Sequence, residues 1–211
     1  AVPEGFDAFG IAYLARALAR DAEKRASVFV HVARDDRRAR AFGEALAFAA
    51  PDIELLDLPA WDCQPYDRVS PNASISARRM TALARLARSR SSEERPRILS
   101  TTVAALLQRV PPLAKVAKDT FSAAPGNAID MDVLIAWLET NGFVRNSTVR
   151  DTGDYAVRGG IVDLFPPALA EPIRLDFFGD TLESIRTFDP ESQRTVGQLR
   201  ALDLVPMSEV Q

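Results

Sequence analysis

RGGIVDLFP, residues 158–166, and RLDFFGD, residues 174–180, decide the fold of the second half of this chain. Both runs are rich in strand-forming residues and are bounded by Gly, Asp and Pro, which is typical of antiparallel strands. Arginine and aromatic side chains dominate docking surfaces, so strands that carry Arg158, Arg174 and Phe178 indicate a partner-binding face. An ordinary half-buried sheet edge explains the same residues equally well, because Phe on a strand is usually core and Arg is usually solvated.

The segments around these runs predict an α+β domain over residues 113–195. Asp130 can cap a helix that Gly142 can end, and a strand is predicted at residues 116–122. Antiparallel strands are predicted at residues 143–149, 159–165, 172–178 and 182–188. Residues 199–205 are expected to return as a strand that rejoins the first domain, so residues 196–211 are set apart as the start of a returning segment.

The first half of the chain alternates helices with strands. Apolar spacing predicts helices at residues 11–22, 35–49, 74–88 and 102–108, and strands at residues 27–32, 53–57 and 97–101. This alternation favours an α/β domain with a parallel sheet covered on both faces. Pro111 and Pro112 cannot continue a helix, so the domain is predicted to span residues 1–112.

Composition narrows the class of protein. The chain has 211 residues, 47% of them hydrophobic, and a net charge of -3, so it can bury real cores and has no global drive towards nucleic acid. It contains no bilayer-length apolar run and no signal-peptide order at its start, and a cytoplasmic setting is expected. Cys63 and His31 are the only residues of their types. A single cysteine cannot form an internal disulfide, and a single histidine cannot form a multi-histidine metal site. His31 is expected to be a strand residue whose ring nitrogens find hydrogen-bond partners within the fold.

Nucleotide binding is not expected at the turn before the first helix, residues 2–10. A phosphate-binding loop needs small residues, a Lys and a Ser or Thr, and this turn has neither Lys nor hydroxyl. The acidic residues Glu4 and Asp7 and the bulky Phe6 and Phe9 would occupy the space that phosphates need. No catalytic residue, cofactor or metal ligand is therefore predicted.

A basic stretch at residues 78–97 offers an alternative function, nucleic-acid binding. Its arginines are Arg78, Arg79, Arg85, Arg88, Arg90, Arg95 and Arg97. Such a cluster can follow a phosphate backbone, but it has no aromatic residue, and single-strand binding usually pairs cations with stacking rings. A solvated helix face and loop is the competing interpretation.

An ordered set of strings carries a family resemblance over essentially the whole chain. They are LPAWD at residues 58–62, PYD at 65–67, SP at 70–71, LLQRV at 106–110, GDYAVRGG at 153–160 and RLDFF at 174–178. In these strings the chain resembles the N-terminal UvrB-homology module of the bacterial transcription-repair coupling factor (Mfd). It is more distantly similar to the excision-repair subunit UvrB, through Arg-Gly-x-x-x-Asp-x-Phe-Pro and Phe-Asp-Pro.

The resemblance implies a non-catalytic adaptor for transcription-coupled repair. It implies a degenerate helicase-like domain like UvrB domain 1A, an inserted domain like UvrB domain 2 that docks the protein UvrA, and the start of a domain 1B-like segment. The family's docking residues match Arg158, Arg174 and Phe178. In the full-length family, an ATP-dependent DNA translocase, other domains contact RNA polymerase and DNA.

The chain also departs from UvrB. UvrB has a true phosphate loop and an aromatic-rich hairpin that enters DNA, whereas this chain has only the short segment 62–72, with Trp61 and Tyr66, where that hairpin would project. Neither ATP hydrolysis nor damage verification is expected of these residues.

Overall fold

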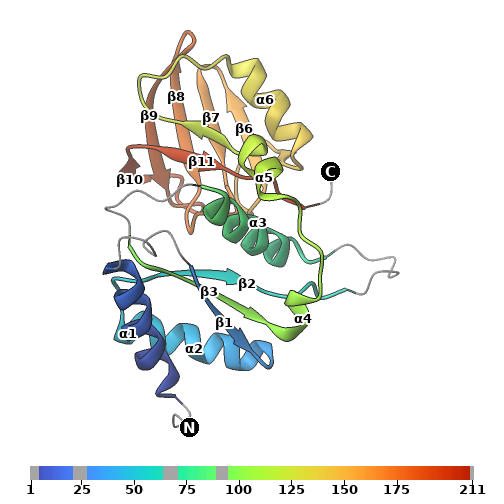
Figure 1. The fold of residues 1–211 in the computed structure, drawn as a ribbon. Coiled ribbons are helices and arrows are strands. Elements are labelled where there is room, and N and C mark those ends of the chain that lie inside the picture. Colours follow the sequence, from blue (N-terminus) through green and yellow to red (C-terminus); the bar gives the residue numbers. More distant parts are fainter. Residues whose placement is uncertain (1–4, 21–27, 64–70, 89–94, 210–211) are drawn as a thin grey trace. The chain divides into compact units, whose positions relative to one another are not determined.

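A computed structural model describes residues 5–20, 28–63, 71–88 and 95–209. The chain divides into two compact units, Ala1–Leu113 and Ala114–Gln211. Each unit has its own sheets, and Figure 1 labels their helices and strands. The two are described separately below.

The first unit is built on a three-stranded parallel sheet in the order β1-β3-β2. Its strands are β1 (Phe29–Ala33), β2 (Glu54–Leu58) and β3 (Arg97–Thr102). Its helices are α1 (Asp7–Arg20), α2 (Asp36–Ala49), α3 (Ala73–Ala87) and α4 (Val103–Leu106). The predicted alternation and the parallel pairing are confirmed, with element ends shifted by a few residues.

Helices α1 and α2 cover one face of this sheet, and α3 lies on the other (Figure 1). Small residues on α1, Ala8, Ala12 and Ala15, pack with Phe42 and Leu46 of α2 in one apolar cluster. The central strand β3 is buried along its whole length. Coverage of both faces is only partial, because Val30 and Val32 of β1 are exposed. Helices nevertheless lie on both faces, as predicted, and these exposed side chains belong to the edge strand β1.

His31 is a half-buried strand residue, as expected from its apolar surroundings. Its ring stacks on Phe42 with centroids 3.8 Å apart, and Nδ1 lies 3.4 Å from Ser100 Oγ. Burial lowers the pKa of His31, the Asp7 carboxylate opposes that shift and Arg38 adds to it. The residue serves packing within the first unit.

The second unit is built on a six-stranded sheet in the order β10-β9-β8-β7-β6-β5. Its strands are β5 (Val144–Arg145), β6 (Asp154–Arg158), β7 (Ile161–Leu164), β8 (Ile173–Phe178), β9 (Thr181–Phe188) and β10 (Thr195–Leu199). The unit also contains α5 (Leu113–Asp119), α6 (Met131–Thr140), and a small sheet of β4 (Phe121–Ala123) with β11 (Leu202–Leu204).

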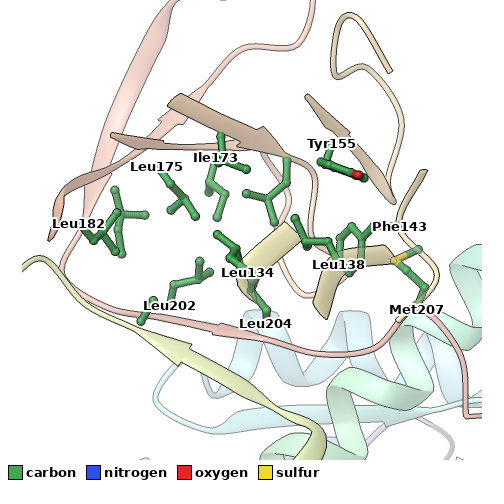
Figure 2. Close-up of a cluster of buried hydrophobic side chains, with 14 residues drawn as sticks. Leu134, Leu138, Phe143, Tyr155, Ile173, Leu175, Leu182, Leu202, Leu204 and Met207 are labelled. Carbon is green, nitrogen blue, oxygen red and sulfur yellow. The ribbon is translucent and has the colours of Figure 1, made fainter. Parts of the chain in front are cut away.

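One face of the six-stranded sheet packs on α6 and on the β4–β11 pair (Figure 2). Leu134 and Leu138 of α6 meet Ile173 and Leu175 of β8 in a fully buried cluster. Asp130 caps α6 by accepting bonds from the amides of residues 132 and 133, as predicted. Gly142, with φ +86°, follows the end of the helix in the left-handed region that favours glycine.

Three predictions for this unit are wrong. Residues 113–119 form helix α5, and only Phe121–Ala123 is a strand, because the residue spacing there also suits a helical turn. The β5 strand pairs with β6 in parallel, not antiparallel. The strand within residues 199–205, β11, pairs with β4 inside the second unit instead of rejoining the first, because Leu202 and Leu204 complete the core around α6.

The β6–β7 turn gives a testable prediction at Gly160. A Cβ on Gly160 would lie 2.8 Å from the carbonyl oxygen of Phe177, whose amide donates to the Gly160 carbonyl across the sheet. Because that neighbour is backbone, Gly160→Ala is expected to destabilise the second unit by roughly 1–3 kcal/mol. The check is denaturant unfolding followed by Trp137 fluorescence in a Trp61→Phe background.

Gly159→Ala is the contrasting variant for this measurement. Its Cβ would meet open space, so only its φ of +60° opposes the substitution. An unchanged midpoint for Gly160→Ala would contradict the predicted clash.

Candidate protein-binding face

The second face of the six-stranded sheet carries charges of both signs on four adjacent strands, β6 to β9. Side chains alternate along a strand, so the residues between the buried Ile173 and Leu175, and next to the buried Val162, point away from α6. We call this surface the charged face. Its members are Arg158 of β6, Asp163 of β7, Arg174 and Asp176 of β8, and Arg186 of β9.

Arg174 is held by a two-bond ion pair with Asp163. Arg174 Nε lies 2.7 Å from Asp163 Oδ1 and Nη2 lies 2.9 Å from Oδ2, across directly paired positions of β8 and β7. The side chains are 19% and 3% exposed. Such a bidentate pair is strong and fixes the plane of the guanidinium. It uses the Nε–Nη2 edge of the guanidinium, and Nη1 takes no part in these two bonds.

The Arg174 guanidinium also stacks on an aromatic ring. Its Cζ lies 5.0 Å from the centroid of Phe188, a distance at which a cation is attracted to the ring face. Phe188 packs with Val149 and Ala156 in a small apolar cluster beneath it. The hydrogen bond to Asp163 raises the pKa of Arg174, so the group stays charged.

Arg158 lies at the end of β6, next to the turn into β7. Its side chain is exposed, and Nη2 donates a 2.7 Å hydrogen bond to the carbonyl of Ser147. That bond ties the loop after β5 to the edge of the charged face. Arg158 therefore presents an exposed guanidinium that is anchored to the backbone at Ser147.

Phe178 ends β8 on the side of the charged face. Its neighbour Phe177 packs against the core on the other side, and Phe178 itself is 77% exposed. Full burial of such a ring relative to exposure contributes roughly 1.5–3 kcal/mol. The structure thus places Arg158, Arg174 and Phe178 on one face, with the ring at its margin.

Sequence reasoning missed the carboxylates that order this face, and also missed Arg186. Asp176 Oδ2 accepts bonds from Ser184 Oγ at 2.6 Å and from Arg186 Nε and Nη2 at 2.9 and 2.6 Å. Each aspartate is separated from its arginine by about ten positions or more, so the pairs follow from strand register. The alternation of side chains along each strand could have placed these residues on one face. It could not have shown which aspartate pairs with which arginine.

Comparison with known proteins identifies the family. A family described as "UvrB interaction domain" matches residues 121–210, a range that contains the whole charged face. The transcription-repair-coupling factor of Myxococcus xanthus is 41% identical over 189 residues, 86% of this chain and 15% of the relative. Those of Haemophilus influenzae and Escherichia coli are each 33% identical, over 92% and 91% of this chain and 16% of each relative.

The chain belongs to the transcription-repair-coupling factor family, as its UvrB-homology module. It spans only about a sixth of the length of these relatives, which leaves most of a transcription-repair-coupling factor outside the matched region. The resemblance predicted from the short strings is therefore confirmed.

The turn before α1 is described from Gly5 onward, and Glu4 lies outside the described residues. Asp7 Oδ1 accepts a 3.0 Å bond from the amide of Ala8, so a carboxylate already occupies one of the first amides of α1. Phe6 and Phe9 lie against each other with centroids 5.3 Å apart. A phosphate would meet a negative charge and two rings at this helix start.

Much of the basic stretch is used within the first unit. Arg79 is fully buried, donates to the Pro59 carbonyl at 2.6 Å and lies over the Trp61 ring at 5.3 Å. Glu54 binds both Arg85 and the buried Arg97. Because these arginines are bonded within the first unit, they are less available to bind a nucleic acid, which is the alternative function.

The other members of the stretch differ in their surroundings. Arg88 follows α3 with an exposed side chain, and its carbonyl accepts a 3.5 Å bond from Arg97 Nη1. Arg78 pairs with Asp57 at 2.8 Å, and Arg95 donates to the Pro51 carbonyl at 3.3 Å. Arg90 lies outside the described residues, as does Tyr66 of the segment where a UvrB hairpin would project. The arginines of the basic stretch therefore do not form a single row of solvated charges.

The described residues contain neither a candidate metal cluster nor a candidate membrane-spanning helix. No group of three or more His, Cys, Asp or Glu side chains among them is placed to hold a metal ion. Likewise, within the described ranges, no helix has the length and apolar character needed to cross a membrane.

Proposed function

We propose that this chain is a non-catalytic adaptor that docks UvrA through the charged face. Arg158, Arg174 and Phe178 are the docking residues in this proposal. The observation that carries it is their placement on one face, within the region that matches the UvrB interaction domain. Residues of these types dominate the energetics of protein interfaces.

The geometry suits an acidic partner surface with an apolar slot. Arg174 is oriented before binding by Asp163 and Phe188, so little side-chain entropy is lost when Nη1 meets a carboxylate. Phe178 is exposed and can enter an apolar slot, and Arg158 can form charge-assisted bonds beside it. Binding of this kind requires no chemistry at the face.

Within a full-length transcription-repair-coupling factor, the adaptor would bring UvrA to a stalled RNA polymerase. Polymerase contact and ATP-dependent movement on DNA belong to other domains in this proposal. Residues 1–112 are taken as a degenerate helicase-like domain and residues 113–195 as the UvrA-docking domain. The Asp7 carboxylate and the paired rings at the start of α1 support a first domain without nucleotide chemistry.

The direct test is binding of UvrA by the 211-residue chain, with Phe178→Ala as the probe of the apolar slot. Saturable binding is expected for the native chain, and a loss of about 2 kcal/mol, roughly thirtyfold, for Phe178→Ala. Phe178→Leu should recover much of the affinity because it restores apolar area. Absence of saturable binding by the native chain would contradict the proposal.

A further inference from the structure

We infer that Arg186 is a fourth docking residue, which extends the binding surface from β8 onto β9. This inference rests on the proposed function, and its partner is the same acidic protein surface. It adds a residue that the resemblance does not assign. Three observations carry it: strand register, side-chain exposure and the balance of charge on the face.

Strand register places Arg186 directly opposite Arg174 on neighbouring antiparallel strands. Like charges at such positions destabilise a sheet. Each guanidinium is instead matched to its own carboxylate, Asp163 for Arg174 and Asp176 for Arg186. Two oriented guanidinium groups therefore lie side by side, an arrangement that a pair of carboxylates on a partner can bridge.

Exposure favours Arg186 over Arg174 as a contact. The Arg186 side chain is 41% exposed, against 19% for Arg174, while its partner Asp176 is 18% exposed. Both bonds from Arg186 go to one oxygen, Asp176 Oδ2, through Nε and Nη2. Nη1 is not used in either bond. A partner that reaches Arg174 on β8 has still easier access to Arg186 on β9.

The charge of the face selects the partner. Arg158, Arg174 and Arg186 outnumber Asp163 and Asp176, and both carboxylates are already occupied by guanidinium groups. The remaining donors therefore recognise carboxylates. A single-stranded nucleic acid would need rings among the cations on which to stack its bases, and Phe178 lies at the margin instead.

The test compares Arg186→Ala with Arg145→Ala in calorimetric titrations of the full 211-residue chain into UvrA. Arg145 is an exposed cation on β5, and its partner in the register is Tyr155, whose side chain faces the core. Arg186→Ala is expected to weaken binding about tenfold and to reduce its dependence on salt. Arg145→Ala is expected to bind like the native chain.

Unfolding followed by Trp137 fluorescence, in a Trp61→Phe background, confirms that each variant keeps the fold of the second unit. Native binding that Arg186→Ala leaves intact would overturn the inference while the proposed function stands. Failure of the native chain to bind would remove the proposed function itself. Loss of affinity for a labelled DNA duplex, with UvrA binding intact, would assign Arg186 to phosphate and also overturn the inference.

Discussion

Glu54→Gln is expected to lower the free energy of unfolding of the first unit by about 3 kcal/mol or more. Glu54 Oε2 accepts a 2.9 Å bond from Arg97 Nε, and Oε1 accepts a 2.7 Å bond from Arg85 Nε. The Arg97 side chain is only 2% exposed. Removing the carboxylate charge therefore takes the Glu54 ion pair away from a buried cation, which is the costly way to break a buried pair.

The two tryptophans allow this effect to be measured in one unit at a time. Trp61 lies in the first unit and Trp137 in the second, and the chain has no other tryptophan. In a Trp137→Phe background, Trp61 fluorescence during denaturant unfolding reports the first unit. Asp52→Asn is the matched control, because it breaks the more exposed pair with Arg16 and should shift the midpoint far less. Equal shifts for the two variants would contradict the buried-pair account.

The Arg158→Ala, Arg174→Ala double variant is expected to bind UvrA roughly a thousandfold more weakly than the native chain. Truncating one interface anchor typically costs about 2 kcal/mol, and two such losses that add give roughly this factor. The two arginines lie on β6 and β8, with β7 between them, and have different intramolecular partners. Near-additivity is therefore the expectation, and each single variant should lose roughly thirtyfold.

The double variant needs a control for indirect effects. Arg174→Ala removes the partner of Asp163, a carboxylate that is almost completely buried, so it can also destabilise the sheet. Arg174→Lys keeps a cation near Asp163 but cannot reproduce the planar two-bond pair. If affinity is lost in Arg174→Lys while the Trp137 unfolding transition is preserved, the effect belongs to the docking surface.

Local signals in the sequence located some helix ends well, although other elements begin or end a few residues from their predicted positions. Asp35 and Asp130 accept bonds from amides at the starts of their helices, because an Asp at that position satisfies donors that a helix leaves unpaired. Gly142 follows α6 because glycine adopts positive φ without strain. These rules act over a few residues and need no tertiary contact.

Pairing between distant segments could not be predicted in the same way. The parallel β5–β6 pair and the β11–β4 pair depend on how the core around α6 closes, and residue types alone do not encode that choice. The same limit applies to the candidate site. Arg174 and Phe178 could be named as candidates from the strings around them, but the match of Arg174 to Asp163 required the register of β7 with β8.

In the basic stretch, by contrast, the charge pattern indicated more exposed cations than the structure contains. Arg79 and Arg97 count as surface cations in the sequence, yet both are buried and bonded in the structure. Their long side chains reach the Pro59 carbonyl and the Glu54 carboxylate from neighbouring elements. The positive charges of this stretch therefore contribute to the stability of the first unit.

The central claim is that the charged face docks UvrA, and parallel calorimetric titrations test it most directly. The native chain, the Arg158→Ala, Arg174→Ala double variant and Arg145→Ala would each be titrated against UvrA. The account predicts saturable binding by the native chain and by Arg145→Ala, with binding by the folded double variant lost or weakened roughly a thousandfold. Equal affinity of the native chain and the double variant would contradict it.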